Sequence, residues 1–177
     1  MKALKLALPL LVSLACTSVH AAELDPTEAN ARLTQVLTCK RNVTPEQFEA
    51  LVKAAHGKAI VQASDLSDGE YTVPNPLDVF GRAVTRLAMH PGSNGEGDFN
   101  TYYGVFTGES IQAVAKLADV PQDEFGQYKK EVGNHDLWLY ADGSDTSISC
   151  SYDMRTVVKT IKSTARKAAD AVQRATQ

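Results

Sequence analysis

Two cysteines far apart in the sequence constrain the fold of this chain more than any other feature. Cys39 and Cys150 enclose more than a hundred residues, and a disulfide between them would tie the first part of the domain to the last. In the chain-entropy description, closing a loop of that length stabilises the folded state by about 4–5 kcal/mol. The sequence therefore predicts a disulfide-bonded domain that folds in an oxidising compartment.

The first 21 residues have the three zones of a cleavable secretory signal peptide. Lys2 and Lys5 give a positive start, the stretch from Leu6 to Ala15 is almost wholly apolar, and small residues follow up to Ala21. The apolar stretch is shorter than the roughly 20 residues of a membrane-spanning helix. We expect cleavage near Ala21, a periplasmic or secreted location, no transmembrane segment, and one mature domain over residues 22–177.

The third cysteine lies inside this leader and leaves an alternative open. Cleavage after Ala21 would discard Cys16, so that an even number of cysteines remains. A bacterial lipoprotein is instead cleaved just before a cysteine that becomes lipidated, and Ala15 suits that reaction. Ser13, however, stands where such motifs usually carry leucine. Lipidation of Cys16 is the minor alternative to a freely exported domain.

Helix and strand signals follow one another in an order typical of an α+β domain. Four helices are expected from their apolar spacing and caps, beginning near Asp25, Thr44, Ile111 and Asp153. Four strands are expected as two hairpins, over residues 82–89 with 101–106 and residues 135–140 with 146–152. The sequence therefore predicts a single α+β domain, in which a small antiparallel sheet of about four strands packs with about four helices.

The last of these strands indicates where Cys150 points. Ile148, Cys150 and Tyr152 alternate along it with three serines, so the cysteine shares the apolar face of the strand. That face packs on the core, where the end of the first helix would bring Cys39.

The charge of the mature chain is unevenly distributed. Without the two leader lysines it has 16 basic and 21 acidic residues, a net charge of −5. Residues 154–177 hold six of those bases and one acid, so the rest of the domain has 10 bases and 20 acids. An acidic body of this kind argues against nucleic acid as the main partner.

The basic C-terminal segment has an apolar stripe that becomes alanine-rich after Ile161. A solvated basic face is its ordinary interpretation. Contact with a membrane surface is an alternative, although small alanine side chains insert poorly into lipid.

No catalytic or cofactor motif is present in the sequence. The acid–base candidates beyond the common carboxylates are His90, His135 and Asp136. His135 and Asp136 are adjacent on a strand, so their side chains point to opposite faces and cannot orient each other. We expect no cofactor and no catalytic residues, and a hydrolytic site built from a histidine and a distant carboxylate stays the enzymatic alternative.

Aromatic side chains are the leading candidates for a binding surface. Trp138 and Tyr140 share one face of a predicted strand, and Tyr102 and Tyr103 lie on another strand. Tryptophan and tyrosine are enriched at binding hot spots. A covered central strand is the alternative interpretation of these bulky residues.

The loop before the second of these strands is the other candidate. Asn94, Glu96 and Asp98 alternate with glycines, which is the pattern of oxygen ligands that a calcium loop needs. The loop lacks the distal bidentate glutamate of an EF-hand, and the composition also suits an ordinary hairpin loop, so we assign it no metal.

These observations together favour a non-enzymatic binding protein of the bacterial cell envelope. An exported, disulfide-bonded and acidic domain without catalytic motifs could meet a basic protein, as an inhibitor or an immunity protein does. A small secreted hydrolase and a structural or lipid-anchored envelope protein are the alternatives.

Overall fold

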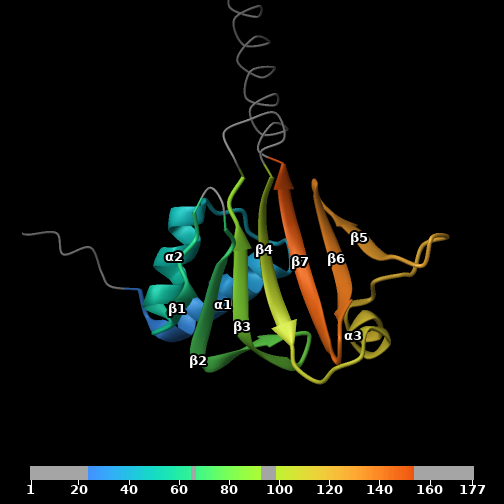
Figure 1. Cartoon of the computed structure of the whole chain (residues 1–177), viewed down its shortest axis with the longest axis horizontal. Helices are drawn as coiled ribbons and strands as arrows, with labels where there is room; N and C mark the ends of the chain where they lie inside the picture. The colour runs from blue at the N-terminus through green and yellow to red at the C-terminus, as the bar shows by residue number, and fades with distance from the viewer. Residues whose placement is uncertain (1–23, 65–66, 93–98, 154–177) are drawn as a thin grey trace, which may run out of the picture.

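The chain forms one antiparallel sheet of seven strands, with three helices, in the part that the structure describes (Figure 1). The computed structural model describes residues 24–64, 67–92 and 99–153. The helices are α1 (Pro26–Leu37), α2 (Pro45–Ala54) and α3 (Ile111–Ala118), and the strands are β1 (Lys58–Val61), β2 (Gly69–Val79), β3 (Arg82–His90), β4 (Phe99–Phe106), β5 (Tyr128–Val132), β6 (His135–Asp142) and β7 (Asp145–Asp153).

This architecture corrects the predicted fold class. The described chain is mostly β, so the prediction of a sheet of about four strands packed with about four helices is wrong. The fourth helix was expected to begin at Asp153, which is instead the last residue of β7. The remainder of that predicted helix and the predicted leader, residues 1–21, lie outside the described residues.

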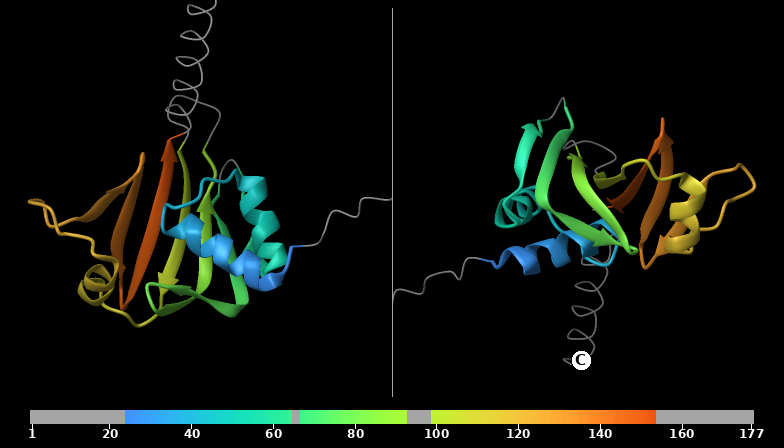
Figure 2. Two further views of the ribbon diagram at one scale, coloured as in Figure 1. Left: turned by 180° about the vertical axis from the view of Figure 1, so that it is seen from behind. Right: turned by 90° about the horizontal axis from the view of Figure 1, so that it is seen from below.

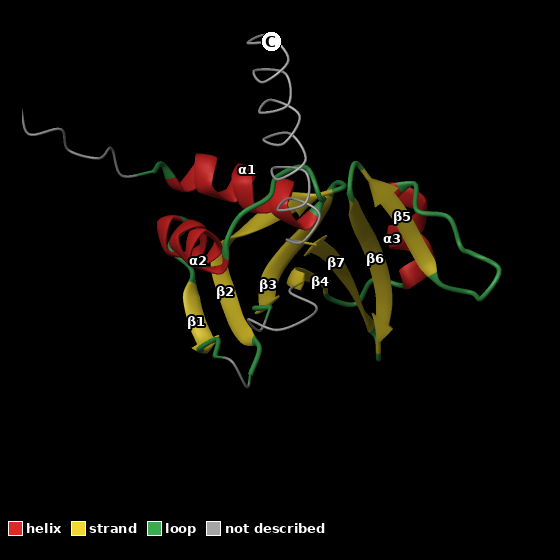
Figure 3. Cartoon of the chain, turned by 90° about the horizontal axis from the view of Figure 1, so that it is seen from above, coloured by secondary structure: helices red, strands yellow, loops and turns green. Residues whose placement is uncertain are grey.

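The sheet is assembled from two sets of neighbouring strands that meet in its middle. Its order is β1-β2-β3-β4-β7-β6-β5, and all its pairs are antiparallel. The chain runs from β1 to β4, crosses through α3 to the far edge, and returns through β5 and β6 to place β7 beside β4 (Figure 3). The expected hairpins β3–β4 and β6–β7 are both present, and the β4–β7 contact joins them.

Three strands, β1, β2 and β5, lie outside the two expected hairpins, and each departs from the regular strand pattern. β1 is exposed along its whole length, so it shows no alternation of apolar and polar residues. β2 contains Pro74 and Pro76, and its register shifts between Thr72 and Leu77, which is where a sheet tolerates proline. β5 carries Lys129 and Lys130 at an edge of the sheet, where charge discourages further pairing.

The helices begin where their caps predicted. The Asp25 carboxylate accepts hydrogen bonds from the backbone N–H groups of Thr27 and Glu28 at the start of α1. At the start of α2, the Thr44 hydroxyl accepts from the Gln47 N–H, and the Gln47 side chain accepts from the Thr44 N–H. This reciprocal capping box satisfies two backbone donors that would otherwise have no partner.

All three helices bury their apolar sides in one core on one face of the sheet. Seen from behind in Figure 2, α1 and α2 lie across the sheet. The buried side chains of α1, α2 and α3 form one hydrophobic cluster with every second side chain of the central strands, the ones that point toward the helices. Gly104 on β4 allows this close approach, because a Cβ atom there would lie 2.8 Å from a methyl carbon of Leu37.

The predicted disulfide is confirmed. Cys39 follows α1 and Cys150 lies on the core-facing side of β7, with 5.4 Å between their Cα atoms. The bond joins the end of the first helix to a central strand, as the alternation along residues 147–152 predicted.

Candidate binding face

The sheet face opposite the three helices is the candidate functional surface, and we call it the helix-free face because no helix of the described residues covers it. Strand pairing places Tyr103 of β4, Ser149 of β7 and Trp138 of β6 in one row across this face. Their neighbours along the strands, Tyr102 and Leu139, point to the core. Alternation along each strand therefore separates an apolar core side from a side that carries aromatic, hydroxyl and charged groups.

Trp138 and Tyr140 form a flat aromatic platform on this face. They lie two residues apart on β6, their ring centroids are 6.1 Å apart, and their planes differ by 5°. The ammonium group of Lys129 lies 4.7 Å from the Trp138 ring centroid and 3.0 Å from the Asp136 carboxylate. These contacts hold the indole in place. Tyr140 keeps 44% of its surface exposed, so the platform presents a rigid, partly accessible apolar patch.

Tyr103 and Ser149 occupy the middle of the helix-free face. Burial raises the pKa of the Tyr103 phenol, and the nearby charge of Asp68 acts in the same direction. The hydroxyl oxygen of Ser149 is buried and has no hydrogen-bond partner among the described residues. A buried hydroxyl without a hydrogen-bond partner destabilises the folded protein, and such groups are often found at functional sites.

An acidic cleft of about 290 Å³ opens beside Tyr103 and extends over β2, β3 and β4 toward β6. Its charged lining residues are Asp68, Glu70, Asp142 and Arg86. The Arg86 guanidinium is directed to Asp145, at 3.5 Å from its carboxylate. Among the described lining residues three are acidic and one is basic. Arg86 contacts Asp145 and Asp68 contacts His90, so the carboxylates of Glu70 and Asp142 give the cleft a negative field that favours a cationic group.

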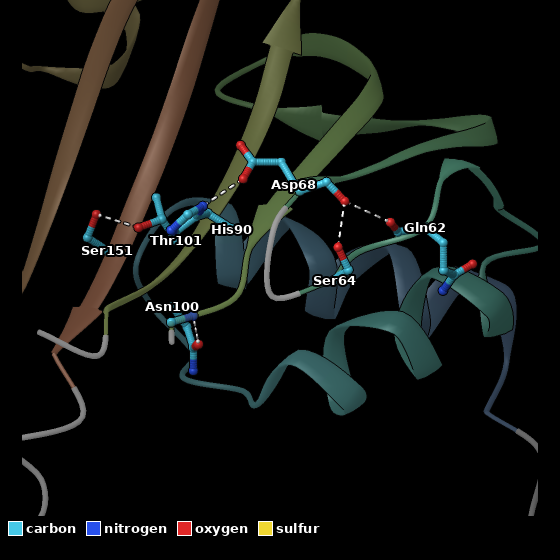
Figure 4. A network of polar contacts seen from close by, with 9 residues as sticks. Gln62, Ser64, Asp68, His90, Asn100, Thr101 and Ser151 are labelled. Atoms are coloured by element: carbon cyan, nitrogen blue, oxygen red, sulfur yellow. Dashed lines mark hydrogen bonds and ion pairs between the residues drawn. The ribbon is translucent and has the colours of Figure 1, made fainter. Parts of the chain in front are cut away.

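A row of polar side chains continues across the end of this face, as Figure 4 shows. His90 is paired across the strands with Thr101, and Thr101 with Ser151. The Nδ1 atom of His90 lies 2.6 Å from the Asp68 carboxylate, and the hydroxyls of Thr101 and Ser151 are 3.2 Å apart. The structure thus places a histidine against a carboxylate, which is the pair that a hydrolytic site would need.

The surroundings of that pair do not complete a catalytic arrangement. The side chains of His90 and Asp68 are 56% and 53% exposed. Within the described ranges, no hydroxyl lies within hydrogen-bonding distance of the second His90 ring nitrogen. An activated nucleophile needs such a contact to its base, so this pair has the features of a surface ion pair.

His135 and Asp136 point to opposite faces of the sheet. The His135 ring lies on the core side, 4.3 Å from the ring of Tyr152, and its Nδ1 atom is buried without a partner among the described residues. Asp136 lies on the helix-free face with Lys129. Burial lowers the pKa of His135, and the smaller opposing effect comes from the Asp136 charge.

The aromatic candidates chosen from the sequence divide between the two faces. Trp138, Tyr140 and Tyr103 lie together on the helix-free face. Tyr102 lies in the core, where its hydroxyl donates to the Val43 carbonyl at 2.7 Å and its ring is 4.7 Å from that of Phe48. The loop candidates Asn94, Glu96 and Asp98 lie outside the described residues.

The acidic cleft was missed by the sequence interpretation. Asp68 and Glu70 belong to one end of the sheet order and Asp142 to the other half of the chain, so no local spacing connects them. The only local signal was Glu70, which alternates with the buried Gly69 and Tyr71 and therefore had to face away from the core.

The described residues also contain no group of three or more histidine, cysteine, aspartate or glutamate side chains placed to hold a metal ion. No helix in those same ranges is long and apolar enough to cross a membrane. No protein-family model matches the chain, and neither the curated proteins nor the solved structures include a match to it.

Proposed function

We propose that this protein is an exported, non-enzymatic binding protein that holds a basic protein partner on its helix-free face, as an inhibitor or an immunity protein would. The observation that carries the proposal is the stacked pair of Trp138 and Tyr140 on the same face as the acidic cleft. Export rests on the signal-peptide pattern of residues 1–21, and the Cys39–Cys150 disulfide is compatible with it.

The aromatic platform and the cleft would play different parts in binding. A partly exposed tryptophan–tyrosine pair loses little side-chain entropy on contact and buries a large apolar area, which is typical of interface hot spots. The carboxylates of Asp68, Glu70 and Asp142 would accept a lysine or arginine side chain of the partner. Charge complementarity of this kind speeds association and selects among partners.

Trp138 is the only tryptophan of the chain, so its fluorescence reports directly on this face. The first experiment titrates the mature protein with an oligolysine peptide and with an oligoglutamate peptide of the same length. We expect a saturable change of Trp138 emission with oligolysine only, and a weaker affinity as the salt concentration rises. Binding of both peptides, or of neither, would contradict the proposed cleft.

The second experiment identifies the natural partner with matched variants. Periplasmic extract of the source bacterium is passed over wild-type protein, the Glu70→Gln/Asp142→Asn variant and a Tyr140→Ala variant. The control is Glu124→Gln, which removes an exposed carboxylate outside the cleft. A basic protein retained by the wild type and the control but lost from both other variants supports the proposal. Equal retention of that basic protein by all four immobilised proteins refutes the proposal.

The same preparation tests export. The mature amino terminus is read by mass spectrometry, because a chain that begins at Ala22 and a chain that begins at a diacylated Cys16 differ greatly in mass. We expect the chain that begins at Ala22.

A further inference from the structure

A second hollow, of about 430 Å³, lies between α3, the loop over residues 121–127 and the edge of β6. None of the described residues that line it is charged. Its lining includes Gln112, Gln122 and Gln127. Its aromatic residues are Tyr128, Trp138 and Tyr140, and the last two also form the aromatic platform. An uncharged hollow with several glutamines differs chemically from the acidic cleft, and we call it the amide pocket.

The amide pocket arises because β5 is shorter than β6. β5 begins at Tyr128, which is paired with Leu139, whereas β6 continues to Asp142. Within the described residues, the edge of β6 from Tyr140 onward therefore has no strand beside it on that side. Helix α3, whose amino end is capped by Ser110, supplies the opposite wall.

The loop that closes the pocket is held in shape by its own hydrogen bonds. The Asp123 carboxylate accepts from the backbone N–H groups of Phe125 and Gln127 at 2.9 and 2.8 Å. The Gln122 amide nitrogen donates to the Gly126 carbonyl at 2.9 Å. A loop fixed in this way loses less conformational freedom when a ligand binds.

The polar groups of the pocket are still available to a ligand. Within the described ranges, no hydrogen bond engages the side-chain amides of Gln112 or Gln127. Each primary amide offers two donors and an acceptor, so it can pair with the hydroxyl groups of a ligand in either sense. A charged ligand would lose hydration without gaining a counter-charge in this pocket.

We propose that the amide pocket binds a neutral saccharide. A sugar ring has hydroxyl groups that suit the glutamine amides and an apolar ring face that suits the partly exposed ring of Tyr140. The volume of the pocket lies in the range of small-ligand sites. An uncharged peptide strand suits it less well, because only Tyr140–Asp142 of the β6 edge would be free to pair with it.

The test uses defined sugars and the glutamine side-chain NH₂ resonances. Mature, isotope-labelled protein is titrated with cellotetraose, maltotetraose and tetra-N-acetylchitotetraose up to about 10 mM, a concentration at which weak binding is still measurable. Tetragalacturonate serves as the charged comparison, and a tetra-alanine amide as the peptide. We expect at least one neutral sugar to shift the side-chain resonances of Gln112, Gln122 and Gln127, with no shift from the charged sugar or the peptide.

The amide pocket shares Trp138 and Tyr140 with the aromatic platform, so the test variants change glutamines that lie outside the platform and the acidic cleft. The Gln112→Ala/Gln127→Ala variant should weaken the neutral sugar at least about tenfold and leave the Trp138 response to oligolysine unchanged. The matched control is Gln35→Ala, which removes an exposed glutamine of α1. Unchanged melting temperature of both variants verifies folding. Three results would overturn the saccharide site: no resonance shift with any neutral sugar, equal binding of tetragalacturonate or the peptide, or full sugar affinity in the double variant. None of these results would contradict the proposed protein partner.

Discussion

The hydroxyl of Tyr152 on β7 donates to the carbonyl of Val36 at 2.9 Å, in the last turn of α1, and also lies against the carbonyl of Arg41. Two residues earlier on the same strand, Cys150 is bonded to Cys39. A hydrogen bond and a covalent bond thus fasten the carboxyl end of α1 to the same core-facing side of β7. The four predictions below test these ties, the packing around them and the partly buried histidine beside them.

Removal of the disulfide should destabilise the domain without changing its fold. We expect the Cys39→Ala/Cys150→Ala variant to lose about 4–5 kcal/mol of unfolding free energy, because its unfolded chain is no longer closed into a loop of this length. Urea denaturation measures the loss. Wild-type protein treated with a reductant is the control and should agree with the variant to within about 1 kcal/mol. Two free thiols in denatured, unreduced wild-type protein would contradict the bond itself.

Loss of the Tyr152 hydroxyl should also weaken the α1–β7 contact. Tyr152→Phe leaves the ring in place but removes a hydroxyl that donates to the buried carbonyl of Val36 and lies against that of Arg41, which costs about 1–3 kcal/mol. Tyr102→Phe should behave similarly, because its hydroxyl donates to Val43. Tyr140→Phe is the control: its ring is exposed and its hydroxyl has no partner among the described residues. Thermal melts in which all three variants match wild type would show that these bonds contribute nothing.

The features that could be predicted from the sequence are those encoded within a few residues of one another. The capping box at Thr44, the two hairpins and the direction of Cys150 follow from local spacing, and the structure confirms them. The grouping of Trp138 with Tyr140 on one side of β6 has the same origin, because it needs only the alternation of a strand.

The size of the sheet and the acidic cleft could not be predicted in this way. β2 continues through Pro74 and Pro76 only because its neighbours hold it across a shift in register. The cleft brings Asp68 near Asp142 because β7 pairs with β4, a long-range contact that joins two sets of strands. Such contacts depend on tertiary packing, which overrides local preference.

Acid should destabilise the domain through His135. Burial lowers its pKa below the ordinary value of 6.5 in the folded state, more than the Asp136 charge raises it. Below pH 6.5 the unfolded chain therefore binds more protons at this position than the folded chain. This contribution to stability is complete above pH 6.5 and is lost as the pH falls toward the folded-state pKa.

The variant that tests this effect is His135→Phe, which keeps a ring against Tyr152 but cannot titrate. Denaturation curves measured at intervals from pH 7.5 to about pH 5 should show a steeper loss of stability for wild type than for the variant. Equal slopes would show that His135 is protonated as readily in the folded chain as in the unfolded one.

Gly104 should be required for the close packing of α1 on the sheet. In Gly104→Ala the new Cβ would lie 2.8 Å from a methyl carbon of Leu37, and less closely, at 3.2 and 3.3 Å, against Val84 and Ile148. All three neighbours are fully buried, so none can move aside without disturbing the core. We expect a loss of about 1–3 kcal/mol, the usual cost of overpacking.

A double-mutant cycle identifies the cause of that loss. Leu37→Ala alone should cost about 2–5 kcal/mol, because it leaves a cavity in the core. In the Gly104→Ala background the same truncation should cost less, because it also removes the closest clash, so the two changes should couple by about 0.5–3 kcal/mol. Urea denaturation of the four proteins gives the coupling energy. If the two single losses of unfolding free energy simply add in the double variant, the clash with Leu37 is not the cause of the loss in Gly104→Ala.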